Sequence, residues 1–166
     1  MINKYPKTTK TVITASAIAA LAAFAATEEG TRYIPYFDPP GILTVCQGHT
    51  GPEIIKNKKY TNDECAKFLA EDAKEALEIV ASCVPYELPP SVFIAFSDAV
   101  FNLGPKIACD PKQSHAAKYL QAGEFKLACA ELPKWDKARV AGVLVPLPGL
   151  TKRRNREYKF CITDLV

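Results

Sequence analysis

The pattern of apolar and polar positions divides the chain into three zones. An almost unbroken apolar run covers residues 12–26. Residues 31–46 alternate aromatic, β-branched and polar side chains around a turn, a pattern typical of strands. From Thr61 onward, apolar residues recur three or four positions apart with acids between them, as in amphipathic helices. The pattern therefore predicts a small β region followed by a helical region.

The apolar run from Val12 to Ala26 is rich in alanine and is interrupted only by Thr14 and Ser16. As a helix it would span roughly 22 Å, which is short of a hydrocarbon core of about 30 Å. Alanine also contributes little to membrane insertion. Residues 1–10 contain lysines and no acid, so this end is expected to stay cytoplasmic. We expect residues 11–27 to contact the inner membrane as a weak anchor.

The β region is predicted from two short strands and the turn between them. Thr31–Phe37 is aromatic and β-branched, Asp38–Gly41 reads Asp-Pro-Pro-Gly, and Ile42–Cys46 returns before Gly48. Prolines and glycines in that order favour a tight turn. The segment predicts a β-hairpin or a three-stranded antiparallel sheet.

The helical region begins with a capping signal. Thr61 is followed three residues later by Glu64, the pattern of a capping box, and the helix is expected to end near Ser82. A second, strongly apolar helix is predicted over 92–103, starting near the prolines at 89–90. Further helices are expected at 114–121, 124–132 and 152–163, with a loop over 142–149 before the last one.

Composition and charge indicate one globular domain that is not a general nucleic-acid binder. The chain has 166 residues, 48% of them hydrophobic, and a net charge of +3. All of that excess comes from Lys4, Lys7 and Lys10, since residues 28–166 hold 21 − 3 = 18 basic and 18 acidic side chains. A nucleic-acid binder needs a basic face to neutralise phosphates.

The cysteines favour disulfides over a metal site. The six are widely spaced, with no Cys-x-x-Cys pair, and only two histidines are present. We expect no metal and no cofactor. An even cysteine count behind a targeting-like N-terminus indicates an oxidising compartment, but the pairing stays open. The candidates are Cys46, Cys65, Cys83, Cys109, Cys129 and Cys161.

Two carboxylates and a hydroxyl flank the predicted turn. Cleavage of a glycosidic bond needs a carboxylic acid for the leaving oxygen and a second, ionised group that activates water. Glu29 follows an apolar segment that would raise its pKa, whereas Asp38 opens a polar turn and stays ionised more easily. Thr44 has a hydroxyl that would hold a water near Asp38. Spacing alone is weak support, because an Asp before Pro is usually a turn residue.

The wider motif resembles the T-even phage lysozyme family of endolysins. Glu29, Asp38 and Thr44 lie in register with Tyr-x-Pro-Tyr, Leu-Thr-Val and Gly-His-Thr-Gly. The central-helix ending Ala-Val-Phe-Asn-Leu-Gly at 99–104 and the stretch Pro-Gly-Leu-Thr-Lys-Arg-Arg-Asn-Arg-Glu at 148–157 are also similar to that family. The resemblance covers roughly residues 28–161.

The resemblance implies an α+β, mainly helical lysozyme-like fold with a small antiparallel β lobe at about 30–60 and a helical lobe at about 61–166. It implies Glu29 as general acid, Asp38 as second carboxylate and Thr44 as the water-positioning hydroxyl. The implied substrate is the β-1,4 bond between N-acetylmuramic acid and N-acetylglucosamine in peptidoglycan. A phage-encoded, monomeric lysis enzyme without a cofactor is expected.

Four further residues are supporting candidates. His49 is expected to stabilise the hairpin by pairing with an acid. Asn102 is expected to cap the central helix, with contact to sugar as the alternative. Arg153 or Arg154 pairs with Glu29 or lines the cleft, and the alternative is a solvated helix end that complements the dipole. The acidic run at 71–78 is interpreted as a solvated helix face.

Three readings of the apolar run follow: a cleaved signal peptide, a permanent anchor, or an anchor that later leaves the membrane. Cleavage after Ala26 would leave Glu29 on a frayed terminus, where an acid is poorly held. We therefore favour signal-anchor-release over residues 1–27, with the protein first at the periplasmic side of the host inner membrane and then in the periplasm. The anchor has no cysteine, so Cys46 is interpreted as a structural disulfide rather than a cage.

Two other functions remain open from the residues. A lytic transglycosylase would cut the same bond with one acid, and a disulfide-stapled, membrane-anchored interaction domain would cut nothing.

Overall fold

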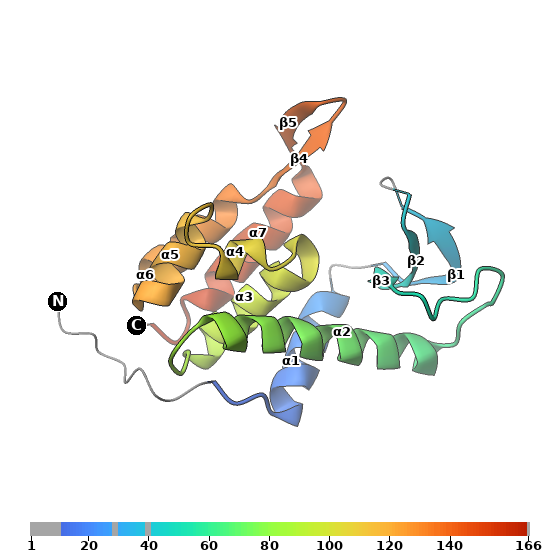
Figure 1. Ribbon diagram of the computed structural model, residues 1–166, viewed down its shortest axis with the longest axis horizontal. Coiled ribbons are helices and arrows are strands. Elements are labelled where there is room, and N and C mark those ends of the chain that lie inside the picture. Colours follow the sequence, from blue (N-terminus) through green and yellow to red (C-terminus); the bar gives the residue numbers. More distant parts are fainter. Residues whose placement is uncertain (1–10, 28–29, 39–40, 166) are drawn as a thin grey trace.

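The computed structural model describes residues 11–27, 30–38 and 41–165. A three-stranded sheet lies at one side, a helical body lies at the other, and the long helix α2 runs from one to the other (Figure 1). The α+β, mainly helical fold predicted from the sequence is confirmed. Glu29 lies outside the described residues, as do Pro39 and Pro40 of the turn.

Helix α1 (Ala15–Ala26) forms most of the alanine-rich segment. The Thr14 hydroxyl caps it by accepting the N–H of Ala17 at 3.1 Å. Leu21 and Ala25 are completely buried, and α1 packs against α2 and α3. In the described part of the chain, no helix combines the length and apolarity needed to cross a membrane.

The β lobe is a three-stranded antiparallel sheet, one of the two forms predicted from the sequence. Strands β1 (Arg32–Phe37), β2 (Leu43–Cys46) and β3 (His49–Thr50) pair antiparallel in that order. Thr44 lies opposite Tyr36 on one side and Thr50 on the other. The β lobe has a small apolar core of its own, formed by Val45, Cys46, Ile54, Tyr60 and Cys65.

Helix α2 (Asn62–Cys83) begins at the predicted capping box. The Thr61 hydroxyl accepts the Glu64 N–H at 3.2 Å, and the Glu64 carboxylate accepts the Thr61 N–H at 2.9 Å. Its apolar stripe faces the main core, as the spacing predicts.

Helix α3 (Pro90–Leu103) is the central helix, with every residue from 91 to 100 buried. Its end is made by Gly104, whose φ of 83° favours glycine and whose N–H donates to the Val100 carbonyl at 2.7 Å. The remaining helical elements complete the helical body, and α4 and α7 pack directly on α3. They are α4 (Lys106–Cys109), α5 (His115–Ala122), α6 (Phe125–Glu131), the 3₁₀ turn η1 (Leu132–Lys134) and α7 (Pro148–Cys161).

The sequence left the disulfide pairing open, and the fold joins neighbours along the chain. Cys46 pairs with Cys65, Cys83 with Cys109, and Cys129 with Cys161. The first bond ties the β lobe to α2, and the other two lie in the helical lobe.

The predicted loop at 142–149 is wrong. Strands β4 (Lys137–Val140) and β5 (Val143–Pro146) form a hairpin that projects from the helical body (Figure 1). Ala141 and Gly142 both have positive φ, as a tight two-residue hairpin turn requires. Most of this hairpin is solvent-exposed, so no alternation of apolar and polar residues marks it in the sequence. Helix α7 accordingly begins at Pro148, four residues earlier than predicted.

Candidate active site

Helix α1 ends at Ala26, three residues before Glu29 in the sequence. Thr27 closes the helix, and its hydroxyl donates to the Phe24 carbonyl at 2.9 Å. The carboxylate of Glu29 itself lies outside the described residues. Its role therefore remains a prediction.

Asp38 lies directly after β1, at the start of the predicted turn. Its Oδ1 accepts the backbone N–H of Ile42 at 2.7 Å, and its own N–H donates to the Ile42 carbonyl at 3.0 Å. The side chain is half-buried.

Thr44 lies on β2 and is 3% exposed. Its hydroxyl donates to the Ile42 carbonyl at 3.1 Å. Because the hydroxyl proton is used in this hydrogen bond, Oγ1 can accept a hydrogen bond from a further donor. Asp38 and Thr44 thus both bond to the backbone of Ile42, and the hairpin brings them together.

A pocket of about 280 Å³ opens between the β lobe and the helical lobe. It starts at Gly48 and Thr50, and Thr50 is the residue paired with Thr44. Its other walls come from α2 and the end of α3, and include Asp72, Glu75, Ile79, Val100, Phe101 and Gly104. Asp38 and Thr44 do not line it. Thr44 lies one strand away.

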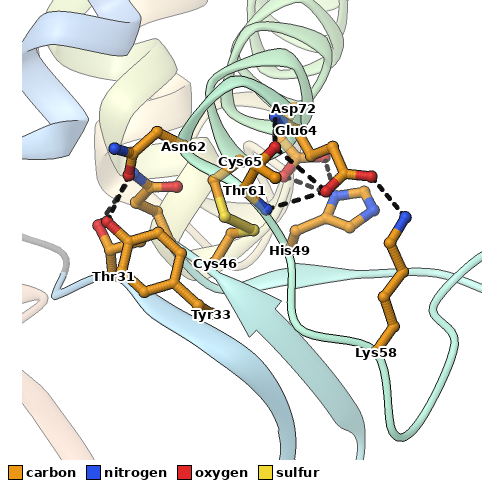
Figure 2. Close-up of a disulfide and its surroundings, with 11 residues drawn as sticks. Thr31, Tyr33, Cys46, His49, Lys58, Thr61, Asn62, Glu64, Cys65 and Asp72 are labelled. Atoms are coloured by element: carbon orange, nitrogen blue, oxygen red, sulfur yellow. Dashed lines mark hydrogen bonds and ion pairs between the residues drawn. A yellow bond between two sulfur atoms is a disulfide. The ribbon is translucent and has the colours of Figure 1, made fainter.

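His49 connects the two lobes beside this pocket through its bonds to Asp72 (Figure 2). Its Nδ1 lies 2.9 Å from Oδ2 of Asp72, and its Nε2 lies 2.6 Å from Oε1 of Glu53. The ring stacks on Phe68 with centroids 3.9 Å apart. Gly51 lies under the Glu53 carboxylate, where a side-chain carbon would collide with it.

The pKa values of the two acids beside His49 shift in opposite directions. A hydrogen bond from its own backbone N–H, and then the bond to His49, lower the pKa of Glu53. Burial is the largest influence on Asp72 and raises its pKa, although the bond to His49 acts to lower it. Asp72 was assigned to a solvated acidic face, which is wrong. It follows Leu69 by one helical turn, so it lies at the edge of the buried stripe, and this spacing was the missed signal.

Arg153 is buried, so its interpretation as a solvated helix end is wrong. Its Nε and Nη2 donate to the two carboxylate oxygens of Asp98 at 3.0 and 2.8 Å. Asp98 is completely buried in α3. A lone acid in an apolar helix requires a cationic partner, a signal that was present in the sequence. Pairing with Glu29 lies outside the described residues.

Arg154 is also completely buried, and its guanidinium bonds to Glu157 one turn later. Burial lowers the pKa of Arg154, and burial followed by a hydrogen bond with Asp98 raises that of Glu157. Together with Asp98 and Arg153 these residues form a buried cluster of two acids and two arginines between α3 and α7. The cluster fixes the position of α7 against the central helix.

Asn102 does not cap α3, because Gly104 ends the helix. Asn102 is half-buried, and its Oδ1 accepts no hydrogen bond within the described chain. Within the same part of the chain, no group of three or more His, Cys, Asp or Glu side chains has an arrangement suited to a metal ion.

Comparison with known proteins gives a consistent family. The phage lysozyme family model matches residues 26–157. A SAR-endolysin of Bacteriophage PS119 is 33% identical over 134 residues, which cover 81% of this chain and 76% of the relative. An endolysin of Acyrthosiphon pisum secondary endosymbiont phage 1 is 33% identical over 129 residues, 78% of this chain and 86% of the relative.

Solved structures share the fold at lower identity. The muramidase domain of SpmX from Asticaccaulis excentricus superposes with a TM-score of 0.76 at 23% identity, covering 93% of this chain and 99% of that one. The active form of the P1 phage endolysin Lyz gives 0.73 at 24% identity, covering 95% and 97%. The sequence matches span most of the chain, so it belongs to the phage lysozyme family and is a muramidase-type glycoside hydrolase.

Proposed function

We propose that the protein is a monomeric phage endolysin that hydrolyses the β-1,4 bond between N-acetylmuramic acid and N-acetylglucosamine in peptidoglycan. Glu29 is the general acid, Asp38 the general base and Thr44 the residue that holds the water. Residues 1–27 are an anchor segment that carries the enzyme to the periplasmic side of the host inner membrane and later joins the domain of residues 28–166.

The chemistry divides between the two carboxyl groups. The Glu29 carboxylic acid gives its proton to the glycosidic oxygen as the bond to the anomeric carbon breaks. Asp38 takes a proton from the water that attacks that carbon. Because the Thr44 hydroxyl donates to Ile42, its lone pairs accept the other hydrogen of this water. One water bound by Asp38 and Thr44 then has a lone pair directed at the sugar.

The observation that carries the proposal is the packing of α1 in the core, three residues before Glu29. Leu21 and Ala25 are completely buried there. An acid on a rigid helix end is positioned for proton transfer, whereas one on a free terminus is not. The same segment is apolar and alanine-rich, so it is suited to a shallow membrane residence and to a helix in water.

The pocket between the lobes is a candidate binding place for the sugar chain. Asp72 and Glu75 offer acceptors for sugar hydroxyls, and Phe101 offers an apolar face. Thr50 links this pocket to the strand that holds Thr44.

Substitution of the proposed site residues tests the chemistry on purified peptidoglycan. Glu29→Gln and Asp38→Asn should each lower kcat by at least about a hundredfold. Thr44→Val should lower kcat, while Thr44→Ser, which keeps the hydroxyl, should retain most of it. Glu78→Gln, on the exposed face of α2, is the matched control. Full activity of Glu29→Gln would overturn the assignment, and little loss in Asp38→Asn would favour a lytic transglycosylase.

Fractionation of cells before and after collapse of the membrane potential tests release. The full-length chain should move from the membrane pellet to the periplasmic fraction as muralytic activity rises. A chain that stays in the pellet would rule out release, and a mature chain beginning near Thr27 would indicate cleavage instead.

A further inference from the structure

One side chain of α7, Arg156, binds the C-terminal end of α1. Its guanidinium carbon lies 3.8 Å from the centre of the Phe24 ring. Its two terminal nitrogens donate to the Phe24 carbonyl and to the Thr27 hydroxyl. The Phe24 ring also packs against Phe160 of α7, with centroids 5.2 Å apart. These residues connect chain positions more than 120 residues apart.

These contacts supply what α1 lacks by itself. The last carbonyls of a helix have no partner within the helix, and its C-terminus carries partial negative charge. α1 has no basic residue in its last turn, and Thr27 rather than glycine follows it. Arg156 brings a positive charge and two donors to this end from another helix. A planar guanidinium makes these bonds and covers an aromatic face at once.

We propose that Arg156 is a positioning residue for Glu29. It fixes the end of α1 through Phe24 and Thr27, and thereby sets where the chain emerges two residues before the general acid. This inference rests on the proposed function, because it takes Glu29 as the acid and α1 as the segment that leaves the membrane. In that setting Arg156 is the group that captures α1 on release.

Among the described residues, no other basic side chain of α7 bonds to α1, and Lys152 is exposed. Arg153 and Arg154 bond to Asp98 and Glu157 in the buried cluster with α3. Lys159 lies further along α7 and is exposed. The contact with α1 is therefore specific to Arg156 among the described basic residues of this helix, and Lys159 provides a matched control.

Three substitutions in the full-length released enzyme test this. Arg156→Met keeps an apolar stem and loses charge and donors, and Arg156→Lys keeps the charge without the planar fork. Small displacements of a catalytic group cost up to about a hundredfold in rate. We expect Arg156→Met to lower kcat about tenfold or more with KM nearly unchanged, Arg156→Lys to lie between it and wild type, and Lys159→Met to match wild type.

Two further readouts separate positioning from general stability. The alkaline limb of the pH profile of kcat should shift in Arg156→Met, because the general acid must carry a proton and that limb reports the loss of this proton. Amide exchange should rise in α1 while α2 and α3 keep their protection. In cells, more of the Arg156→Met protein than of the Lys159→Met protein should remain in the membrane pellet after the potential is collapsed.

The proposal is overturned if Arg156→Met keeps kcat within about twofold of Lys159→Met. It is also overturned if both Arg156 variants lose protection uniformly through α2 and α3, since the residue is then a general stabiliser. In either case a wild type that is released and depends on Glu29 leaves the proposed function intact. Failure of the proposed function shows differently, as a wild type that never leaves the membrane or a fully active Glu29→Gln.

Discussion

Asp98 is an acidic residue in the middle of α3, the buried central helix. Its side chain has no exposed surface, and Arg153 meets it with 4% of its own side chain exposed. Both carboxylate oxygens are bound by one guanidinium, which is the geometry that a buried carboxylate needs. Removing one member of the pair takes from the other charge the partner that binds it through two hydrogen bonds.

Asp98→Asn should lower the free energy of unfolding by about 3–5 kcal/mol, because it removes the carboxylate charge that is paired with the buried Arg153. Glu71→Gln breaks an exposed ion pair in which Nζ of Lys67 lies 3.9 Å from Oε1 of Glu71. This substitution should change the free energy of unfolding by no more than about 0.5 kcal/mol. Urea unfolding of both variants measures the difference. Equal effects would contradict a structural role for the buried pair.

The junction between β2 and α2 is covalent, and it lies close to the proposed site. Cys46 is two residues after Thr44, and Cys65 is in the first turn of α2 (Figure 2). On the β1 side of the same junction, the Tyr33 hydroxyl donates to Asn62 at 2.6 Å. The disulfide therefore holds the strand that carries Thr44 against the helix that joins the lobes.

Replacing Cys46 and Cys65 together by Ala should cost about 3 kcal/mol of stability from loop entropy. The matched change, Cys129 and Cys161 to Ala, should cost slightly more, about 4 kcal/mol, because its loop is longer. Assayed at a temperature where both proteins are folded, only the first pair should also lose activity, since it holds the strand of Thr44. Equal activities would show that the disulfide stabilises without positioning.

On the scale of the whole molecule, the stability of the fold depends on pH through the charges where the lobes meet. The folded pKa of Glu53 lies below its ordinary value of about 4.3. Glu53 thus contributes stability that is present above about pH 4.3 and is lost as the pH falls through the folded pKa. The contribution of Asp72 to stability has the opposite sign. Its folded pKa lies above the ordinary value of about 3.9, so stability falls as the pH rises from about 3.9 to the folded pKa.

Glu53→Gln should therefore make the acid-side loss of stability below about pH 4.3 shallower. Asp72→Asn should instead remove a fall in stability just above about pH 3.9. Both variants lose a bond to His49, so the slopes of unfolding free energy against pH are compared rather than the absolute values. Slopes that change in the same direction would contradict the assigned pKa shifts.

Local patterns in the sequence were sufficient for most of the fold. The capping box at Thr61, the apolar spacing of α2 and the prolines before α3 are signals that act within one or two turns. The exposed hairpin at 137–146 was missed, because no buried face imposes a period on it. The family motif around Asp38 and Thr44 indicated the candidate residues, but it did not indicate the hydrogen bonds to Ile42 that position them.

The sequence by itself determined the zones, the helices, the motif and the presence of disulfides, because these depend on neighbours along the chain. Only the tertiary structure decided the cysteine pairing, the partners of His49 and Arg153, and the contact of Arg156 with the end of α1. Apart from the bond of His49 to Glu53, those contacts join residues 19 to 132 positions apart, and their free energy depends on burial and distances that exist only in the folded chain.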